Sequence, residues 1–190
     1  MDDKGVLIIV SAPSGCGKST VLRRLMELRD TLHFSISATT RQPRAGEREG
    51  VEYFFVSREQ FQEMIRQGAF LEYAEYVGNY YGTPKDAVDE QLDRGCDVYL
   101  DIEVQGAMQV KRQRPETLLI FLMPPSLEEL ERRLVGRGQD HPEIIRKRLL
   151  EAERECAERD KFDYVVTNDV VERAAAEISG IIDGYKNKIK

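Results

Sequence analysis

The chain has 190 residues and a mass of 21.8 kDa, the size of one ordinary domain that can bury a substantial core. Charged residues account for 33% and hydrophobic residues for 41% of it, a globular composition that excludes a disordered chain. The formal net charge of −6 argues against a nucleic-acid-binding surface, which needs a basic face.

The apolar runs and the cysteines limit the cellular compartments in which the protein is expected. The longest apolar runs, residues 6–10 and 118–123, are too short to cross a bilayer, and the first residues lack the features of a signal peptide. Three cysteines without a CxxC pair predict reduced thiols and neither a disulfide framework nor a zinc site. We therefore expect a cytoplasmic protein that does not bind membranes. The two histidines, His33 and His141, give little basis for a histidine-dependent site.

The N-terminal part of the chain predicts a strand, a glycine-rich turn and a helix. Residues 5–10 form a short β-branched apolar run, which indicates a buried strand, and the apolar residues of 20–28 follow helical spacing. Short strand-like pieces at 35–37 and 53–56 flank the basic loop 41–48. This order indicates a strand–turn–helix unit followed by less regular structure.

The next segment carries two helix-start patterns around an aromatic stretch. Ser57 with Gln60 forms a capping-box pattern that opens a helix to about residue 67. Residues 70–81 are rich in aromatic residues and predict a strand. Thr83, followed by a proline, is expected to cap a further helix.

The C-terminal half alternates strands and helices. Strands are expected at 96–102, 117–123 and 164–166, and helices at 105–113, at 126–159 with a break at Gly136 and Gly138, and at 170–186. Such alternation predicts an α/β fold with a parallel sheet flanked by helices. We expect a single domain over residues 1–190 whose core comprises 1–35, 88–126 and 156–190. Residues 36–87, which mix helix and strand patterns, and the helical stretch 127–155 interrupt the alternation and are expected to be insertions on the core.

Residues 11–20, SAPSGCGKST, follow a predicted strand and precede a predicted helix, the context that supports a phosphate-binding loop. Gly15 and Gly17 let backbone N–H groups turn toward an anion, and the helix N-terminus adds partial positive charge. Lys18 is expected to reach the β- and γ-phosphates of ATP, and Ser19 to bind Mg²⁺. The alternative interpretation is a glycine-rich turn that binds no ligand.

Two positions of this loop need comment. Ala12 stands where the usual pattern has glycine, but the extended conformation that precedes a proline suits alanine. Cys16 is expected to be a small residue at a variable position, with a thiol slightly acidified by the nearby lysine. The expected ATP ligands of the loop are Ala12, Pro13, Ser14, Gly15, Cys16, Gly17, Lys18, Ser19 and Thr20.

A second set of residues predicts an acceptor site for a phosphorylated nucleoside. Arg41 and Arg44 flank a proline, and guanidinium groups suit phosphate oxygens. The hydroxyls of Tyr53 and Tyr81 can donate to the same phosphate, and a buried Glu72 can accept from adjacent N–H donors, which guanine has and adenine lacks. The alternative interpretation is that both arginines are solvated loop charges. The two tyrosines would then be half-buried aromatic residues of strands, and Glu72 would be an exposed carboxylate.

The chain resembles the guanylate kinases over nearly its whole length. The matching stretches are residues 11–20, 37–44, 50–55, 78–83, 100–106, 133–140, 148–153 and 163–169. The family comprises ATP:GMP phosphotransferases with a parallel-sheet core, a GMP-binding insertion and a mobile lid, so the resemblance implies a mixed α+β GMP-binding insertion at residues 36–87 and a helical lid at 127–155. The resemblance implies Mg²⁺ as cofactor and ATP and GMP as substrates, with dGMP as a further acceptor, and leaves the oligomeric state open.

The resemblance also implies roles for individual residues. The GMP-phosphate ligands match Arg41, Arg44, Tyr53 and Tyr81, and the residues around guanine match Ser37, Glu72 and Thr83. Asp101 matches an acidic residue at a strand end near the metal and the acceptor, so the implied metal ligands are Ser19 and Asp101. The arginines that close on the phosphates match Arg133, Arg137 and Arg148, and Asn168 matches a residue near the adenine.

One position departs from the family pattern. The family often has aspartate where this chain has Glu103, whose longer side chain is still expected at the acceptor site. The implied catalytic residues are Lys18, Arg41, Arg137 and Arg148. For Arg133 and Arg137, which are four residues apart, the alternative is the solvated face of a charged helix.

No general base is expected, because a phosphate monoester with a second pKa of about 6 is largely anionic at pH 7. Catalysis is expected to rest on positioning and charge stabilisation. Two other functions remain as alternatives: a non-catalytic guanylate-kinase-like module that binds proteins, and a P-loop kinase for another acceptor such as a sugar phosphate. Lys18 with Ser19 argues against the first, and Glu72 with Ser37 against the second.

Overall fold

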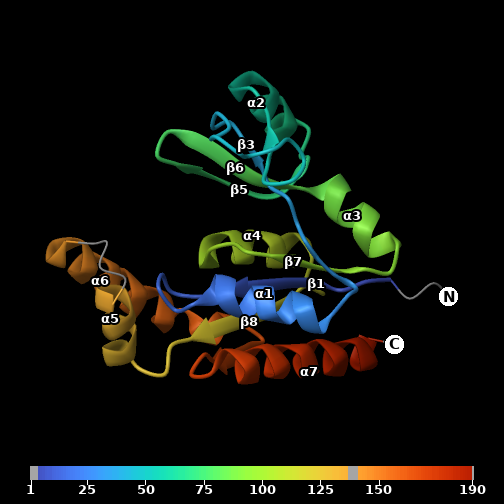
Figure 1. Cartoon of the computed structure of the whole chain (residues 1–190). Helices are drawn as coiled ribbons and strands as arrows, with labels where there is room; N and C mark the ends of the chain where they lie inside the picture. Colours follow the sequence, from blue (N-terminus) through green and yellow to red (C-terminus); the bar gives the residue numbers. More distant parts are fainter. Residues whose placement is uncertain (1–3, 137–140, 190) are drawn as a thin grey trace.

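The computed structural model describes residues 4–136 and 141–189, and its core is a five-stranded parallel sheet (Figure 1). The strands run in the order β2-β7-β1-β8-β9. Their bounds are β1 (Leu7–Ser11), β2 (Leu32–Phe34), β7 (Asp97–Leu100), β8 (Leu118–Met123) and β9 (Tyr164–Thr167). The predicted α/β fold with a parallel sheet is confirmed.

Alternate residues of β1 supply the two hydrophobic layers of this core. Ile8 and Val10 pack with α1 (Lys18–Leu28) and α7 (Val171–Ile189) on one face of the sheet. Leu7 and Ile9 pack on the other face, which α3 (Lys85–Asp93) and α4 (Val104–Gln113) cover. Because both faces are covered, the central strands β1 and β8 are almost entirely apolar, which is why they could be recognised as continuous hydrophobic runs.

A second sheet of four strands stands above the core (Figure 1). Its order is β4-β3-β6-β5, with mixed parallel and antiparallel pairing. The bounds are β3 (Ala38–Thr39), β4 (Phe54–Phe55), β5 (Phe70–Tyr76) and β6 (Asn79–Pro84), and α2 (Arg58–Arg66) packs on this sheet. Phe61 of α2 stacks on Phe70, with ring centroids 4.4 Å apart, and so joins the helix to the sheet.

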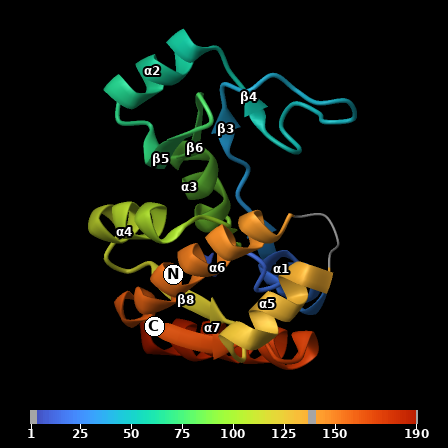
Figure 2. The same ribbon diagram turned by 90° about the vertical axis from the view of Figure 1, so that its left-hand side faces the viewer.

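Two helices, α5 (Leu127–Gly136) and α6 (Pro142–Ala157), form a pair beside the core (Figure 2). Leu130 and Leu134 of α5 pack with Ala152 of α6 in a small hydrophobic cluster. A 3₁₀ turn (Arg159–Lys161) follows α6 and leads into β9. Among the described residues, no helix is both long and apolar enough to cross a membrane.

Several expected element boundaries were wrong. Residues 70–81 form a hairpin of two strands, β5 and β6, instead of one strand. The expected strand at 35–37 falls between β2 and β3. Thr83 lies in β6 and does not cap α3, because Pro84 is the residue that precedes that helix. The capping box of Ser57 and Gln60 at the start of α2 is confirmed.

Candidate active site

The phosphate-binding loop connects the end of β1 to the start of α1. Gly15 and Gly17 adopt φ of 88° and 90°, the left-handed region that glycine enters without strain. Gly17 precedes α1 without a side-chain cap, so this helix N-terminus presents its N–H dipoles to the loop. A cavity of about 290 Å³ is lined by Ala12, Pro13, Ser14, Gly15, Cys16, Gly17, Lys18, Ser19, Thr20, Glu103 and Glu155.

Arg133 and Asn168 support this loop through its backbone. The Asn168 amide donates to the carbonyl of Cys16 at 2.7 Å, and Arg133 Nη1 donates to the same oxygen at 3.1 Å. Arg133 also donates to the Asn168 carbonyl and to Glu129. Arg133 is therefore tied to the P-loop and is not the solvated helix-face charge of the alternative interpretation.

The expectation of an acidified Cys16 thiol was wrong. The side chain is fully buried, and its sulfur lies 3.5 Å from the carbonyl oxygen of Leu122. Burial raises the pKa of Cys16 to about 12, because desolvation of the thiolate outweighs the attraction of Arg133 and Lys18. Cys16 fills space under the loop and presents no reactive thiolate at neutral pH.

Lys18 and Asp101 form an ion pair between the two sides of the site. Lys18 begins α1, and Asp101 follows β7 at the neighbouring strand end. Asp101 lines a second cavity, and Glu103 lines both this cavity and that of the phosphate-binding loop. Parallel strands place their carboxyl ends at one edge of the sheet, which explains why residues so distant in sequence meet here.

The second cavity lies between the second sheet and α4 and has a volume of about 290 Å³. Its lining includes the expected acceptor residues Ser37, Tyr53, Glu72, Tyr81, Asp101 and Glu103, together with Ala74, Glu75, Tyr76, Gly82, Ile102, Gln105, Gly106 and Gln109. The cavity therefore combines aromatic side chains with carboxylates, a lining that suits a nucleobase with N–H donors.

Glu72 is the buried carboxylate of this cavity, with an exposure of 8%. Desolvation raises its pKa above the usual range, although the Thr83 hydroxyl donates to Oε1 at 2.6 Å and opposes the shift. Thr83 is buried beside Glu72 and is not among the residues that line the cavity. A Cβ at Gly106 would lie 3.2 Å from Glu72 Oε2, so this glycine leaves room beside the carboxylate.

Arg41 lies with the two predicted tyrosines. Its guanidinium carbon is 5.3 Å from the centroid of the Tyr53 ring, and the rings of Tyr53 and Tyr81 are 6.0 Å apart. Its side chain is 15% exposed and paired with Glu47, so it is not a solvated loop charge. Arg44 follows on the same loop and is exposed.

Two further arginines were expected to close on the phosphates. Arg137 lies outside the described residues, and Arg148 is half-buried on α6.

Glu155, also on α6, was not predicted, yet it lines the phosphate-loop cavity and accepts from the Ser14 N–H at 3.4 Å. Burial raises the pKa of Glu155. Only its helical spacing from Glu151 could have indicated a shared face, which is a weak signal.

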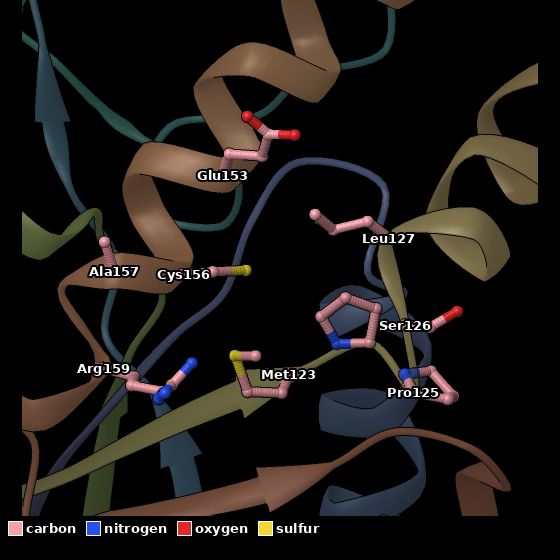
Figure 3. Close-up of a pocket in the computed structure, with 9 residues that line it drawn as sticks. Met123, Pro125, Ser126, Leu127, Glu153, Cys156, Ala157 and Arg159 are labelled. Atoms are coloured by element: carbon pink, nitrogen blue, oxygen red, sulfur yellow. The ribbon is translucent and has the colours of Figure 1, made fainter.

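A separate cavity of about 560 Å³ lies between the β8–α5 connection and the end of α6 (Figure 3). Cys156 and Leu127 reach into it from opposite sides. None of its lining residues is among the predicted nucleotide ligands. The predicted nucleotide ligands that line a cavity are instead found in the two cavities that share Glu103.

Comparisons with known proteins identify the family of this chain. The family model "Guanylate kinase" matches residues 4–185. A guanylate kinase of Streptococcus pneumoniae is 53% identical over 184 residues, covering 96% of this chain and 88% of the relative. One of Clostridioides difficile is 51% identical over 186 residues, covering 98% of this chain and 91% of the relative.

A solved structure gives the same result for the fold. The crystal structure of guanylate kinase from Anaplasma phagocytophilum matches with a TM-score of 0.74 and 35% identity, covering 97% of this chain and 88% of that one. The resemblance noted from the motifs is confirmed over nearly the full length. On the fold, the site and these similarities together, the chain belongs to the guanylate kinase family.

Proposed function

We propose that this chain transfers the γ-phosphoryl group of ATP to GMP, giving ADP and GDP. The observation that carries the proposal is the position of Glu103, which lines both the phosphate-loop cavity and the cavity around Glu72. Two nucleotides bound in these cavities would meet at their phosphate ends, where the Lys18–Asp101 pair lies. Family membership supports the same reaction.

On the donor side, the loop from Ala12 to Thr20 would hold the ATP phosphates through its backbone N–H groups. Lys18 would exchange its contact with Asp101 for the β- and γ-phosphates. Asn168 would contribute near the adenine, and Arg133, Arg137 and Arg148 would stabilise the charge that spreads over the transferred group.

On the acceptor side, the phosphate of GMP would bind the Arg41, Arg44, Tyr53 and Tyr81 set. Glu72 would accept from the guanine N1–H and 2-amino groups, with Ser37 at the wall of the same cavity. A purine whose edge offers an acceptor at N1 would leave Glu72 unpaired in a buried place, which is costly. We extend the acceptors to dGMP.

The residues present fit Mg²⁺, a hard cation that prefers oxygen ligands and keeps phosphate and water in its coordination sphere. Ser19 lines the phosphate-loop cavity, and Asp101 lies beside the neighbouring Lys18. Ser19 and Asp101 would hold the ion. When bound, it neutralises phosphate charge.

The chain's own residues would carry the rest of the reaction by positioning. The GMP phosphate is already largely anionic at neutral pH, so no side chain has to remove a proton before attack. We propose that the insertion 36–87 and the lid 127–155 bring the two phosphates together and exclude water. Lys18 and the arginines offset the repulsion between two polyanions.

A coupled assay of ADP formation with ATP, Mg²⁺ and one nucleoside monophosphate at a time tests this function. We expect ADP with GMP and dGMP and at least about 100-fold less with AMP, CMP or UMP, since the guanine edge makes two charged hydrogen bonds to Glu72, each worth about 1.5–3 kcal/mol, at about 1.4 kcal/mol per decade. ADP formation with a sugar phosphate alone would contradict the acceptor. No transfer to any acceptor would instead support a binding module.

A further inference from the structure

We infer that Glu47 is a positioning residue for the acceptor phosphate: its carboxylate holds Arg41 by one edge and leaves the other edge for the phosphate. The inference rests on the proposed function, in which Arg41 binds the phosphate of GMP. Glu47 lies in the loop between β3 and β4, outside both cavities described above.

The contacts of Arg41 use only part of its hydrogen-bonding capacity. Glu47 Oε1 accepts from Nη2 at 2.8 Å and Oε2 accepts from Nη1 at 3.0 Å, which is the bidentate end-on arrangement. The Gln42 carbonyl accepts from Nη1 at 2.8 Å. Because a guanidinium has five N–H donors, the edge formed by Nε and Nη2 keeps donors for a second anion.

The same carboxylate also fixes the loop that carries Arg44. Glu47 Oε2 accepts from the backbone N–H of Arg44 at 2.7 Å, and the Glu47 N–H donates to the Arg44 carbonyl at 3.1 Å. The side chains of Arg41 and Glu47 are 15% and 18% exposed, so this contact is sheltered from water. The Glu47 carboxylate thus binds both the Arg41 side chain and the backbone at Arg44.

The remaining contacts of Arg41 orient it toward the acceptor cavity. Its guanidinium lies against the ring of Tyr53 and interacts with the Tyr81 hydroxyl, and both tyrosines line that cavity. The hydrogen bond from Arg41 lowers the pKa of Glu47, so the carboxylate is ionised wherever the enzyme works near neutral pH. A carboxylate with three donors, one of them from the backbone, would stay in place when the phosphate arrives.

The variant Glu47→Gln tests this by removing the charge and one acceptor oxygen while keeping the shape. We expect its KM for GMP to rise about 10–100-fold, the loss of one charged hydrogen bond at about 1.4 kcal/mol per decade, with KM for ATP unchanged. The preference for GMP over inosine monophosphate should stay the same, because the base is read elsewhere. Glu47→Asp should retain part of the wild-type affinity.

The matched control is Glu52→Gln on the same loop. Glu52 also accepts a backbone N–H, from Arg48 at 2.6 Å, and its carboxylate lies 3.9 Å from the Arg48 guanidinium. Arg48 is exposed and lines neither nucleotide cavity. Glu52→Gln should therefore leave the KM for GMP unchanged if the rise in KM expected for Glu47→Gln arises from the contact with Arg41.

Calorimetry with two ligands separates the outcomes. Glu47→Gln should weaken binding of GMP but not of guanosine, which lacks the phosphate. A lower KM for GMP in the variant would overturn the inference, since it would make Glu47 a competitor of the phosphate. Equal weakening of GMP, guanosine and ATP would show a general structural role and also overturn it. If the wild type binds neither GMP nor guanosine, the proposed function itself fails.

Discussion

Glu72 combines burial, an incomplete set of hydrogen bonds and a position in the wall of the acceptor cavity. A carboxylate in such a place is costly to ionise unless donors complete its hydrogen bonds. Thr83 supplies one donor, and the guanine edge would supply two more. The charge is therefore stabilised further when the acceptor binds, which is how a buried acid contributes to specificity.

The pH dependence of guanosine binding tests this role of Glu72. Its pKa is raised, chiefly by desolvation and in part by Glu103, which also faces the cavity. Protonation removes an acceptor, so affinity should be present above that pKa and lost as the pH falls through it. Titration calorimetry with guanosine between pH 5 and 8 should show this loss for the wild type.

The matched variant for this experiment is Glu72→Gln. It should bind guanosine about 10–100-fold more weakly at neutral pH and with little pH dependence, since the charged acceptor is gone. Guanosine is used because the GMP phosphate titrates near about pH 6 and would obscure the effect. An equal slope in both proteins would assign the titration to another group, with Glu103 the first to test.

At the scale of elements, regular patterns in the sequence predicted much of the fold. The core strands β1 and β8 are continuous apolar runs, and the start of α2 carries its complete capping box. The hairpin was missed because Val77, in the turn, is a residue that normally belongs in a strand. The two-residue strands β3 and β4 pair with each other, and β3 also pairs with β6. Short-range sequence patterns do not encode such pairing between distant segments.

The turn of this hairpin offers a stability prediction. Val77 has φ of 48°, a conformation that disfavours β-branched residues, and it is 80% exposed. Together with Gly78 at φ 74°, it fits a two-residue turn for which Asn–Gly is the preferred sequence. Val77→Asn should raise the free energy of unfolding by about 1 kcal/mol, measured by urea denaturation, because the left-handed conformation costs most residues about 1–2 kcal/mol and asparagine enters it more readily.

The same substitution elsewhere distinguishes the backbone effect from a general benefit of a polar surface residue. Val165 is 44% exposed and lies in β9, where its backbone is extended. Val165→Asn should give no gain and some loss, because asparagine is disfavoured in strands. Equal stabilisation by both substitutions would contradict an origin in the turn.

At the scale of the whole molecule, the sequence predicted which residues form the site more completely than it predicted which of them contact each other. The phosphate-binding loop is one continuous segment, so its motif predicted it directly. The contacts of Arg133 with the Cys16 carbonyl, of Lys18 with Asp101 and of Glu155 with Ser14 join residues far apart in the chain. They follow from packing of the sheet and helices, which no single motif encodes.

The arrangement of the three parts predicts a change of shape on binding. Arg41 and Arg44 lie in the loop between β3 and β4 of the second sheet, whereas Arg133 and Arg148 belong to the α5–α6 pair, which lies below that sheet and beside α1 (Figure 2). Guanidinium groups on both sides can contact the same phosphates only when both nucleotides are bound between them. We therefore expect both regions to close on the core only when donor and acceptor sites are filled.

Small-angle X-ray scattering with a bisubstrate analogue, adenosine and guanosine joined through phosphates, measures this closure. The radius of gyration should fall toward about 16 Å, the value for a compact chain of this length. GMP alone should give a smaller decrease, because it engages only one set of arginines. Lys18→Ala, which removes a donor-phosphate contact, should need more analogue for the same compaction. An unchanged radius in wild type whose saturation is verified by calorimetry would mean that the arginines act without closure of the two regions.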